Sequence, residues 1–114
     1  MQKKAEIGMV DGKLDDLDYV GYQVTLTDVE GVETYERFVF SETHLGNSLL
    51  VVELDHNEDD GFQVKKLRKT YTRDQRGLNL ANGLSYIIAK TRAIEFAGRE
   101  NIKDFVIEAI AQTS

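Results

Sequence analysis

Six of the twelve residues between positions 65 and 76 are Lys or Arg, and an aromatic residue lies among them. Cations neutralise the phosphates of a nucleic-acid backbone, and an aromatic ring can stack on a base. This run is therefore the candidate nucleic-acid-binding site of the sequence. Its members are Lys65, Lys66, Arg68, Lys69, Tyr71, Arg73 and Arg76.

Strand geometry provides a second interpretation of the same run. Side chains alternate between the two faces of a regular strand, so Lys66 and Arg68 would share one face. Lys65, Lys69 and Arg73 would share the other, and no face would present all the cations. Charged strands also guard the edges of sheets. The run would then be a solvated edge strand whose charge is neutralised by acidic residues elsewhere in the chain.

The segment from 55 to 61 carries side-chain oxygens at alternate positions, an arrangement that can converge on a calcium ion. Asp55, Asn57 and Asp59 are the candidate metal ligands. An EF-hand pattern that begins at Asp55 would need glycine where Asp60 stands and glutamate where Lys66 stands. The segment therefore also fits an acidic hairpin turn that binds no cation.

Both histidines have carboxylates nearby in the sequence. His44 follows Glu42, and His56 lies between Asp55 and Glu58. Imidazole and carboxylate groups together can hold a transition metal. The spacing fixes no common geometry for them, so surface positions in loops are the simpler explanation of both histidines.

Asp55 is followed by Gln63, Val64 and Lys65 at a spacing that suits two arms of one hairpin. The pattern resembles the acid, acid-or-glutamine, any residue, lysine signature of restriction-endonuclease-like nucleases. The resemblance implies that the acids would bind Mg²⁺ and that the lysine would steady the attacking water or the phosphate. Metal-assisted hydrolysis needs more anionic ligands than this arm supplies, because Gln63 stands in place of an acid. We expect no enzymatic activity and no cofactor, with a metal-dependent nuclease as a distant alternative.

Length and composition predict one domain spanning residues 1–114, since 41% of the residues are hydrophobic and 30% are charged. Cysteine and proline are both absent. The lack of cysteine excludes disulfides and thiolate metal sites, and the lack of proline leaves charge to guard the sheet edges. No apolar run reaches the length of a membrane span or a signal peptide. We therefore expect a cytoplasmic protein without membrane contact.

Alternating apolar residues predict two β-hairpins. Residues 20–28 and 32–41 form the first, around a turn that ends at Gly31, with Phe38 and Phe40 on one face and Arg37 and Val39 on the other. Residues 49–54 and 62–72 form the second, although the later segment also shows helical spacing. Residues 4–10 add an edge strand, followed by an acidic loop at 12–18.

Helical periodicity begins near Asn79. The pattern predicts a helix capped by Asn79 or Asn82 and ended by Gly98, and a second helix capped by Asn101. The apolar stripe of the first helix consists of Leu80, Leu84, Ile87, Ile88, Thr91 and Ile94. The second helix carries Ile102, Phe105, Val106, Ala109 and Ile110 on one face. Tyr86 and Phe96 lie off the stripe, where they would pack between helices or against a second subunit.

The expected fold class is therefore α+β. A four- or five-stranded antiparallel sheet of two hairpins fills most of residues 1–77, and two C-terminal helices from 78–114 pack on one of its faces.

Charge is sorted along the chain: residues 1–60 hold fifteen acidic and four basic residues, whereas residues 61–114 hold five acidic and ten basic. A field divided by sign favours oriented association. We therefore expect a small, intracellular, non-enzymatic binding protein. It would contact a protein partner through an acidic β-sheet, or form a homo-oligomer. The alternative is a nucleic-acid-binding protein that uses the basic run at 65–76.

Overall fold

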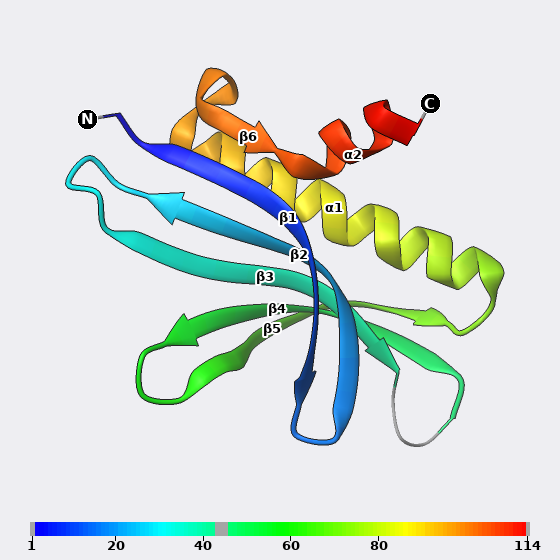
Figure 1. Ribbon diagram of the computed structural model, residues 1–114. Helices are drawn as coiled ribbons and strands as arrows, with labels where there is room; N and C mark the ends of the chain where they lie inside the picture. Colours follow the sequence, from blue (N-terminus) through cyan, green and yellow to red (C-terminus); the bar gives the residue numbers. More distant parts are fainter. Residues whose placement is uncertain (1, 43–45, 114) are drawn as a thin grey trace.

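A computed structural model of the chain describes residues 2–42 and 46–113 (Figure 1). His44 lies outside the described residues. The strands are β1 (Lys4–Leu14), β2 (Leu17–Thr27), β3 (Glu33–Glu42), β4 (Ser48–Asn57), β5 (Gly61–Thr72) and β6 (Ile102–Asp104). The helices are α1 (Gln75–Ala97), the short 3₁₀ turn η1 (Arg99–Asn101) and α2 (Phe105–Thr113).

The strands of the described residues form one six-stranded sheet in the order β5-β4-β3-β2-β1-β6. Strands β1 to β5 are an antiparallel meander, and β6 pairs in parallel with β1, from Ala5 opposite Ile102 to Ile7 opposite Asp104. The α+β class and the two C-terminal helices are confirmed. The parallel sixth strand was not expected, because three residues are too few to show a period of two.

Several predicted boundaries are confirmed and others are wrong. The segment 62–72 is a strand, and Gly31 ends the first hairpin turn with a φ of 86°. The acidic loop expected at 12–18 is wrong, because β1 and β2 pair as far as Leu14 opposite Leu17. A tight turn between these strands leaves Asp15 with a φ of 54°, a conformation that aspartate tolerates better than most residues.

The main core lies between α1 and the face of the sheet beneath it (Figure 1). Its largest fully buried members are Ile7, Val24, Leu26 and Phe38. Each such side chain contributes about 1.5–3 kcal/mol when removed from water. Phe38 and Phe40 share this face as predicted, since both pack in clusters that include α1 residues.

A second core lies on the opposite face of the sheet. Tyr19, Val39 and Leu54 are its buried members, and Val10, Leu14, Val52 and Phe62 pack against them. The guanidinium of Arg37 lies 3.8 Å from the ring centre of Phe62 and donates to the hydroxyl of Tyr19. This cluster joins the β1–β2 hairpin to the β4–β5 hairpin, whose turns both lie at the lower end of the molecule in Figure 1.

The fifteen acidic residues among positions 1–60 are divided between turns, which hold seven, and strands, which hold eight. Asp15 and Asp16 lie in the β1–β2 turn, and Glu58, Asp59 and Asp60 lie in the β4–β5 turn. Among residues 2–42 and 46–113, no helix combines the length and apolar character that crossing a membrane requires.

Candidate functional site

Helix α1 is fixed at its start by a close contact with β5. Asp74 is its N-cap, and the Asp74 carboxylate accepts a hydrogen bond from the Gly77 amide at 2.7 Å. A Cβ on Gly77 would lie 1.7 Å from the carbonyl oxygen of Thr72, so only glycine fits. The predicted caps Asn79 and Asn82 are wrong, because the helix begins earlier, at Gln75. Gly98 ends the helix as predicted, and its amide donates to the carbonyl of Ile94.

Small residues form the face of α1 that contacts the sheet. Gly77, Ala81, Ser85, Ala89 and Ala93 follow one another at intervals of four, and all are buried. Short side chains let the helix backbone approach the strands closely. The predicted apolar stripe is therefore not the sheet-facing side of the helix.

Away from the small-residue face, α1 carries an apolar row that the fold covers only in part, since three of its members line a groove against the β4–β5 hairpin. Leu80 is 44% exposed and Ile87 is 60% exposed. Together with half-buried Leu84 and exposed Thr91 they are spaced four, three and four residues apart. We call these four residues the outer stripe. At about 100° per residue, the stripe points roughly 130° away from the small-residue face.

The basic run occupies β5, the edge strand next to β4. Two irregularities interrupt its pairing. Val51 pairs with Lys69 but Val52 pairs with Leu67, and Glu53 pairs with Lys66 but Leu54 pairs with Val64. Arg68 and Lys65 are consequently the extra residues of two β-bulges.

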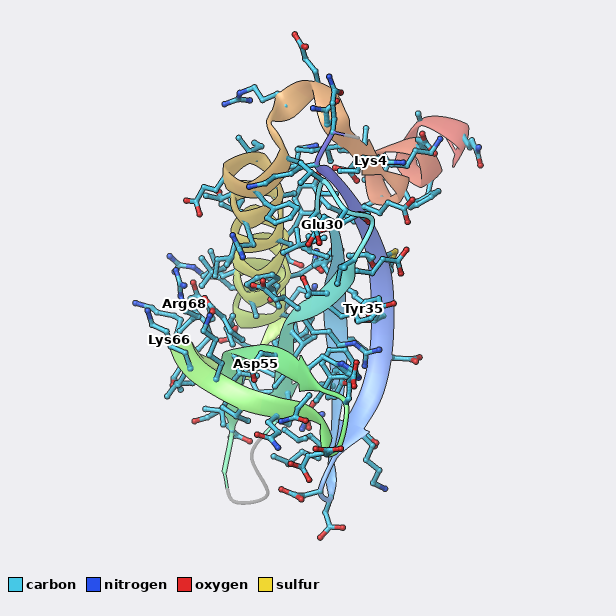
Figure 2. The ribbon with its side chains drawn as sticks, turned by 90° about the vertical axis from the view of Figure 1, so that its left-hand side faces the viewer. Lys4, Glu30, Tyr35, Asp55, Lys66 and Arg68 are labelled. Atoms are coloured by element: carbon cyan, nitrogen blue, oxygen red, sulfur yellow. The ribbon has the colours of Figure 1, made fainter. Side chains whose placement is uncertain are left out.

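The bulges change which face the cations occupy. Val51 and Glu53, the partners of Lys69 and Lys66, point to the α1 side of the sheet. Arg68 also binds Glu53, and Lys65 and Arg68 both line a groove against α1. Four cations thus gather on one side of the hairpin, and we call Lys65, Lys66, Arg68 and Lys69 the basic ridge. Figure 2 shows Lys66 and Arg68 extending together from β5.

The predicted separation of Lys66 and Arg68 from Lys65 and Lys69 is therefore wrong, although no face of β5 presents all six cations of the run. Strict alternation would have separated Lys66 and Arg68 from Lys65 and Lys69. The uncharged residues of this part of β5 pair with β4 residues on the sheet face away from α1. These residues are Val64, Leu67 and Thr70.

The remaining members of the predicted run are not part of the ridge. Arg73 makes an ion pair with Glu42 at 2.7 Å. Arg76 lies exposed in the first turn of α1. Tyr71 is half-buried in a cluster with Leu49 of β4, with the Lys69 ammonium 5.9 Å from its ring centre. The structure therefore brings four of the seven predicted residues together.

A groove of about 370 Å³ separates α1 from the β4–β5 hairpin. Phe38, Leu84 and Ile88 supply apolar lining, and Lys65 and Arg68 supply charge. Its ends carry the ion pairs of Arg68 with Glu53 and of Arg92 with Glu36. Arg92 therefore binds β3 and does not belong to a surface ladder along the helix.

The residues predicted to bind metal lie in and beside the β4–β5 turn. Asp55 is opposite Gln63, and the side-chain oxygen of Asn57 accepts from the Asp59 amide at 2.9 Å. His56 packs edge-on against the rings of Tyr35 and Phe62. In the part of the chain that the structure describes, no three His, Cys, Asp or Glu residues are grouped closely enough to hold a metal ion.

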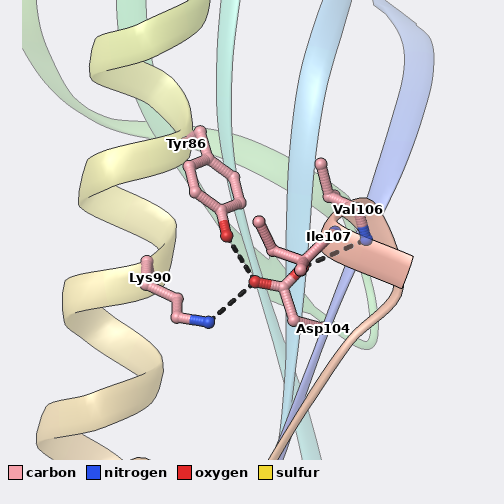
Figure 3. Close-up of polar contacts among 5 residues, drawn as sticks. All are labelled: Tyr86, Lys90, Asp104, Val106 and Ile107. Carbon is pink, nitrogen blue, oxygen red and sulfur yellow. Dashed lines mark hydrogen bonds and ion pairs between the residues drawn. The ribbon is translucent and has the colours of Figure 1, made fainter. Parts of the chain in front are cut away.

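Sequence reasoning missed a polar cluster at the start of α2 (Figure 3). Asp104 is buried, at 9% exposure, and accepts from Lys90 at 2.8 Å and from the Tyr86 hydroxyl. Its other oxygen accepts from the amides of Val106 and Ile107, so Asp104 caps α2 in place of the predicted Asn101. Two signals could have revealed the cluster: Tyr86 and Lys90 are four apart on a helix, and an aspartate precedes an apolar run.

This cluster shifts the ionisation of its members. Burial alone would raise the pKa of Asp104, but hydrogen bonds from Lys90, Tyr86 and Ile107 outweigh it and hold the pKa below its usual value. Burial and the neighbouring Asp104 carboxylate raise the pKa of Tyr86. The cluster therefore keeps a charged aspartate and a neutral tyrosine between α1 and α2.

No protein-family model matches this sequence, and no curated protein or solved structure is significantly similar to it.

Proposed function

We propose that this chain is a non-enzymatic interaction protein that works by self-association through the outer stripe of α1. The single observation that supports the proposal is the position of this stripe. Leu80, Leu84, Ile87 and Thr91 belong to the apolar stripe predicted for this helix, yet the closest contact with the sheet is made by alanine, glycine and serine. An apolar row that the fold leaves partly exposed is typical of a contact with another molecule.

The spacing of the stripe suits a second helix. Intervals of four, three and four residues follow a heptad seam, in which side chains of two helices interlock. If two copies pack antiparallel, with the symmetry axis between Leu84 and Ile87, each Leu84 meets the partner's Ile87. Each Leu80 then meets the partner's Thr91.

The charges at the two ends of the stripe fit the same arrangement. Arg76 precedes Leu80 by four residues, and Glu95 follows Thr91 by four. The antiparallel register places Arg76 of one copy beside the partner's Glu95. Arg76 makes no ion pair within the described residues, and Arg92, the cation nearest to Glu95 on the helix, is bonded to Glu36.

The acidic surface supports a protein contact less well than the stripe does. Seven of its fifteen carboxylates lie in turns, where charge interactions are screened by salt, and Glu36 and Glu53 on the strands are already bonded to Arg92 and Arg68. Burial of Leu80 and Ile87 contributes on both copies, and this gain must exceed an association cost of about 4 kcal/mol or more. We therefore expect a reversible dimer with a dissociation constant of roughly micromolar size.

Sedimentation equilibrium between about 1 and 200 µM tests the proposal, since this range brackets the expected dissociation constant. The unaltered protein should approach twice its monomer mass of 12.9 kDa, and Ile87→Asp should remain monomeric. Val32→Asp is the matched control, because Val32 is 55% exposed but lies before β3. A monomer at every concentration would disprove self-association.

A further inference from the structure

We propose that the basic ridge of β5 binds the phosphate backbone of nucleic acid, independently of base sequence. This site adjoins the outer stripe, because Lys65 and Arg68 line the same groove as Leu84, Ile87 and Thr91, but its binding does not depend on self-association. It consists of Lys65, Lys66, Arg68 and Lys69, which two β-bulges gather on one side of the β4–β5 hairpin.

The local charge of the basic ridge depends on how the nearby carboxylates are paired. Glu53 is bonded to Arg68 of the ridge itself, whereas Glu36 is bonded to Arg92 and Glu42 to Arg73. Lys65, Lys66 and Lys69 make no ion pair within the described residues. Asp55, two residues beyond Glu53 on β4, lies on the same side of the hairpin, and Glu95 of α1 lines the groove with Lys65 and Arg68. Three lysines without an ion pair therefore face two such carboxylates among the described residues.

The acidic turn does not cancel this charge at physiological salt. Lys66 lies six positions after Asp60, a distance of about 20 Å in extended chain. The Debye length at physiological ionic strength is only about 8 Å. The ridge therefore presents a local positive field although the whole chain carries a net charge of −6.

Arg68 differs from the three lysines of the ridge in its contacts. Its guanidinium binds the Glu53 carboxylate, which is buried beneath the hairpin. Arg68 thus anchors the bulged strand, and the three lysines on either side of it remain exposed and available. We assign the phosphate contacts to the lysines and a positioning role to Arg68.

The linear arrangement of the charges on the ridge favours nucleic acid over an acidic protein as its ligand. The ridge is a line of compact charges, and a nucleic-acid backbone is a line of regularly spaced phosphates. Protein interfaces obtain most of their binding energy from apolar or aromatic anchors. Leu67 and Val64, the apolar residues of this part of β5, pair with residues of the other face. Tyr71 is half-buried, so base stacking contributes little and no sequence preference is expected.

Fluorescence anisotropy with single- and double-stranded oligonucleotides, titrated from about 50 to 200 mM salt, tests the site. The test variant is Lys65→Glu/Lys66→Glu/Lys69→Glu, and the control is Lys4→Glu/Lys13→Glu/Arg99→Glu. Both triples lower the net charge equally and alter only exposed residues. The ridge variant should bind at least tenfold more weakly than the control, and its affinity should fall less steeply with salt, by a slope of about 0.7 to 0.9 per lysine removed.

Three results would overturn the inference. They are no binding of either oligonucleotide at about 50 mM salt, equal losses in the two triple variants, and tighter binding of poly-glutamate than of both nucleic acids. Thermal unfolding verifies that each variant folds, and the milder Lys→Gln versions replace any that does not. Leu80→Gln alters the outer stripe outside this groove and adds no charge, so this variant should bind oligonucleotide per chain as the unaltered protein does while self-associating more weakly.

Discussion

The ammonium of Lys90 lies 2.8 Å from a carboxylate oxygen of Asp104, and this ion pair joins the middle of α1 to the start of α2. The other oxygen of Asp104 accepts the first amides of α2. One carboxylate therefore holds both C-terminal helices in place. Its charge is balanced by Lys90 in a position that water scarcely reaches.

Replacing Asp104 with Asn should destabilise the protein most at neutral pH. The variant keeps a capping oxygen but loses the ion pair, at a cost of about 1–2 kcal/mol. Because the folded-state pKa of Asp104 lies below its usual value, its stabilisation is fully present above about pH 4 and is lost as pH falls through the folded pKa. Urea unfolding at pH 7 and at about pH 2 measures both values. A difference between variant and original that is the same at both pH values would contradict this role.

The strands were predictable because their side chains alternate. Val24 and Leu26 point to the core and Gly31 ends the hairpin turn, so local pattern and turn chemistry agree. The side of α1 that contacts the sheet was not predictable in the same way. A hydrophobic stripe predicts the buried face only when large residues make the contact, and here Ala81, Ala89 and their small neighbours make it.

The basic ridge could be predicted by composition but not by geometry. The residues Lys65 to Arg76 stand out in the sequence, whereas the two bulges that place Lys65 and Arg68 on the α1 side depend on register with β4. No single-strand pattern specifies that register. The Asp104 cluster is a similar case, because Asp104 is 14 residues from Lys90 and 18 from Tyr86 and meets them where β6 pairs with β1.

Ser85→Ala should stabilise the protein by about 1 kcal/mol. The hydroxyl of Ser85 is fully buried and has no hydrogen-bond partner among the residues described. Removing it abolishes a desolvation cost and improves helix propensity. Thermal unfolding should show a midpoint raised by roughly 3 °C or more. Ser41→Ala is the matched control: its buried hydroxyl donates to the Asp18 carbonyl at 2.6 Å, so this change should lower stability. A loss of stability in both variants would contradict the assignment.

Two glycines of α1 should respond to alanine in opposite directions. A Cβ at Gly77 would meet the Thr72 carbonyl, so Gly77→Ala must displace the start of the helix and should cost about 2 kcal/mol or more. A Cβ at Gly83 meets nothing within 4 Å, so Gly83→Ala should stabilise the helix by about 0.5–1 kcal/mol. Chemical denaturation measures both changes. Equal effects at the two positions would show that α1 does not dock on β5 as described.

The charges at the ends of the outer stripe provide a test of the antiparallel dimer that is independent of apolar burial. Arg76→Glu and Glu95→Arg should each weaken self-association, because each replaces two attractive pairs of the symmetric dimer with two repulsive ones. At about 0.3–1 kcal/mol per exposed pair, we expect a roughly 3- to 30-fold higher dissociation constant for each single variant. The double variant restores opposite charges across the interface and should recover most of the original affinity. Sedimentation at low salt measures all four proteins, since screening reduces the effect at high salt.

The recovery in the double variant distinguishes the antiparallel register from other arrangements. In a parallel pair, position 76 of one copy would lie near position 76 of the other, and swapping both charges would leave like charges facing each other. Glu95→Arg could also weaken the dimer indirectly, because it removes the carboxylate near Arg92 within the same helix. The Glu95→Gln control removes that carboxylate without creating repulsion across the interface. Glu95→Gln should therefore weaken the dimer less than Glu95→Arg does. A double variant that associates no better than the weaker single variant would rule out the antiparallel pairing of α1 while leaving a different use of the stripe to be tested by Ile87→Asp.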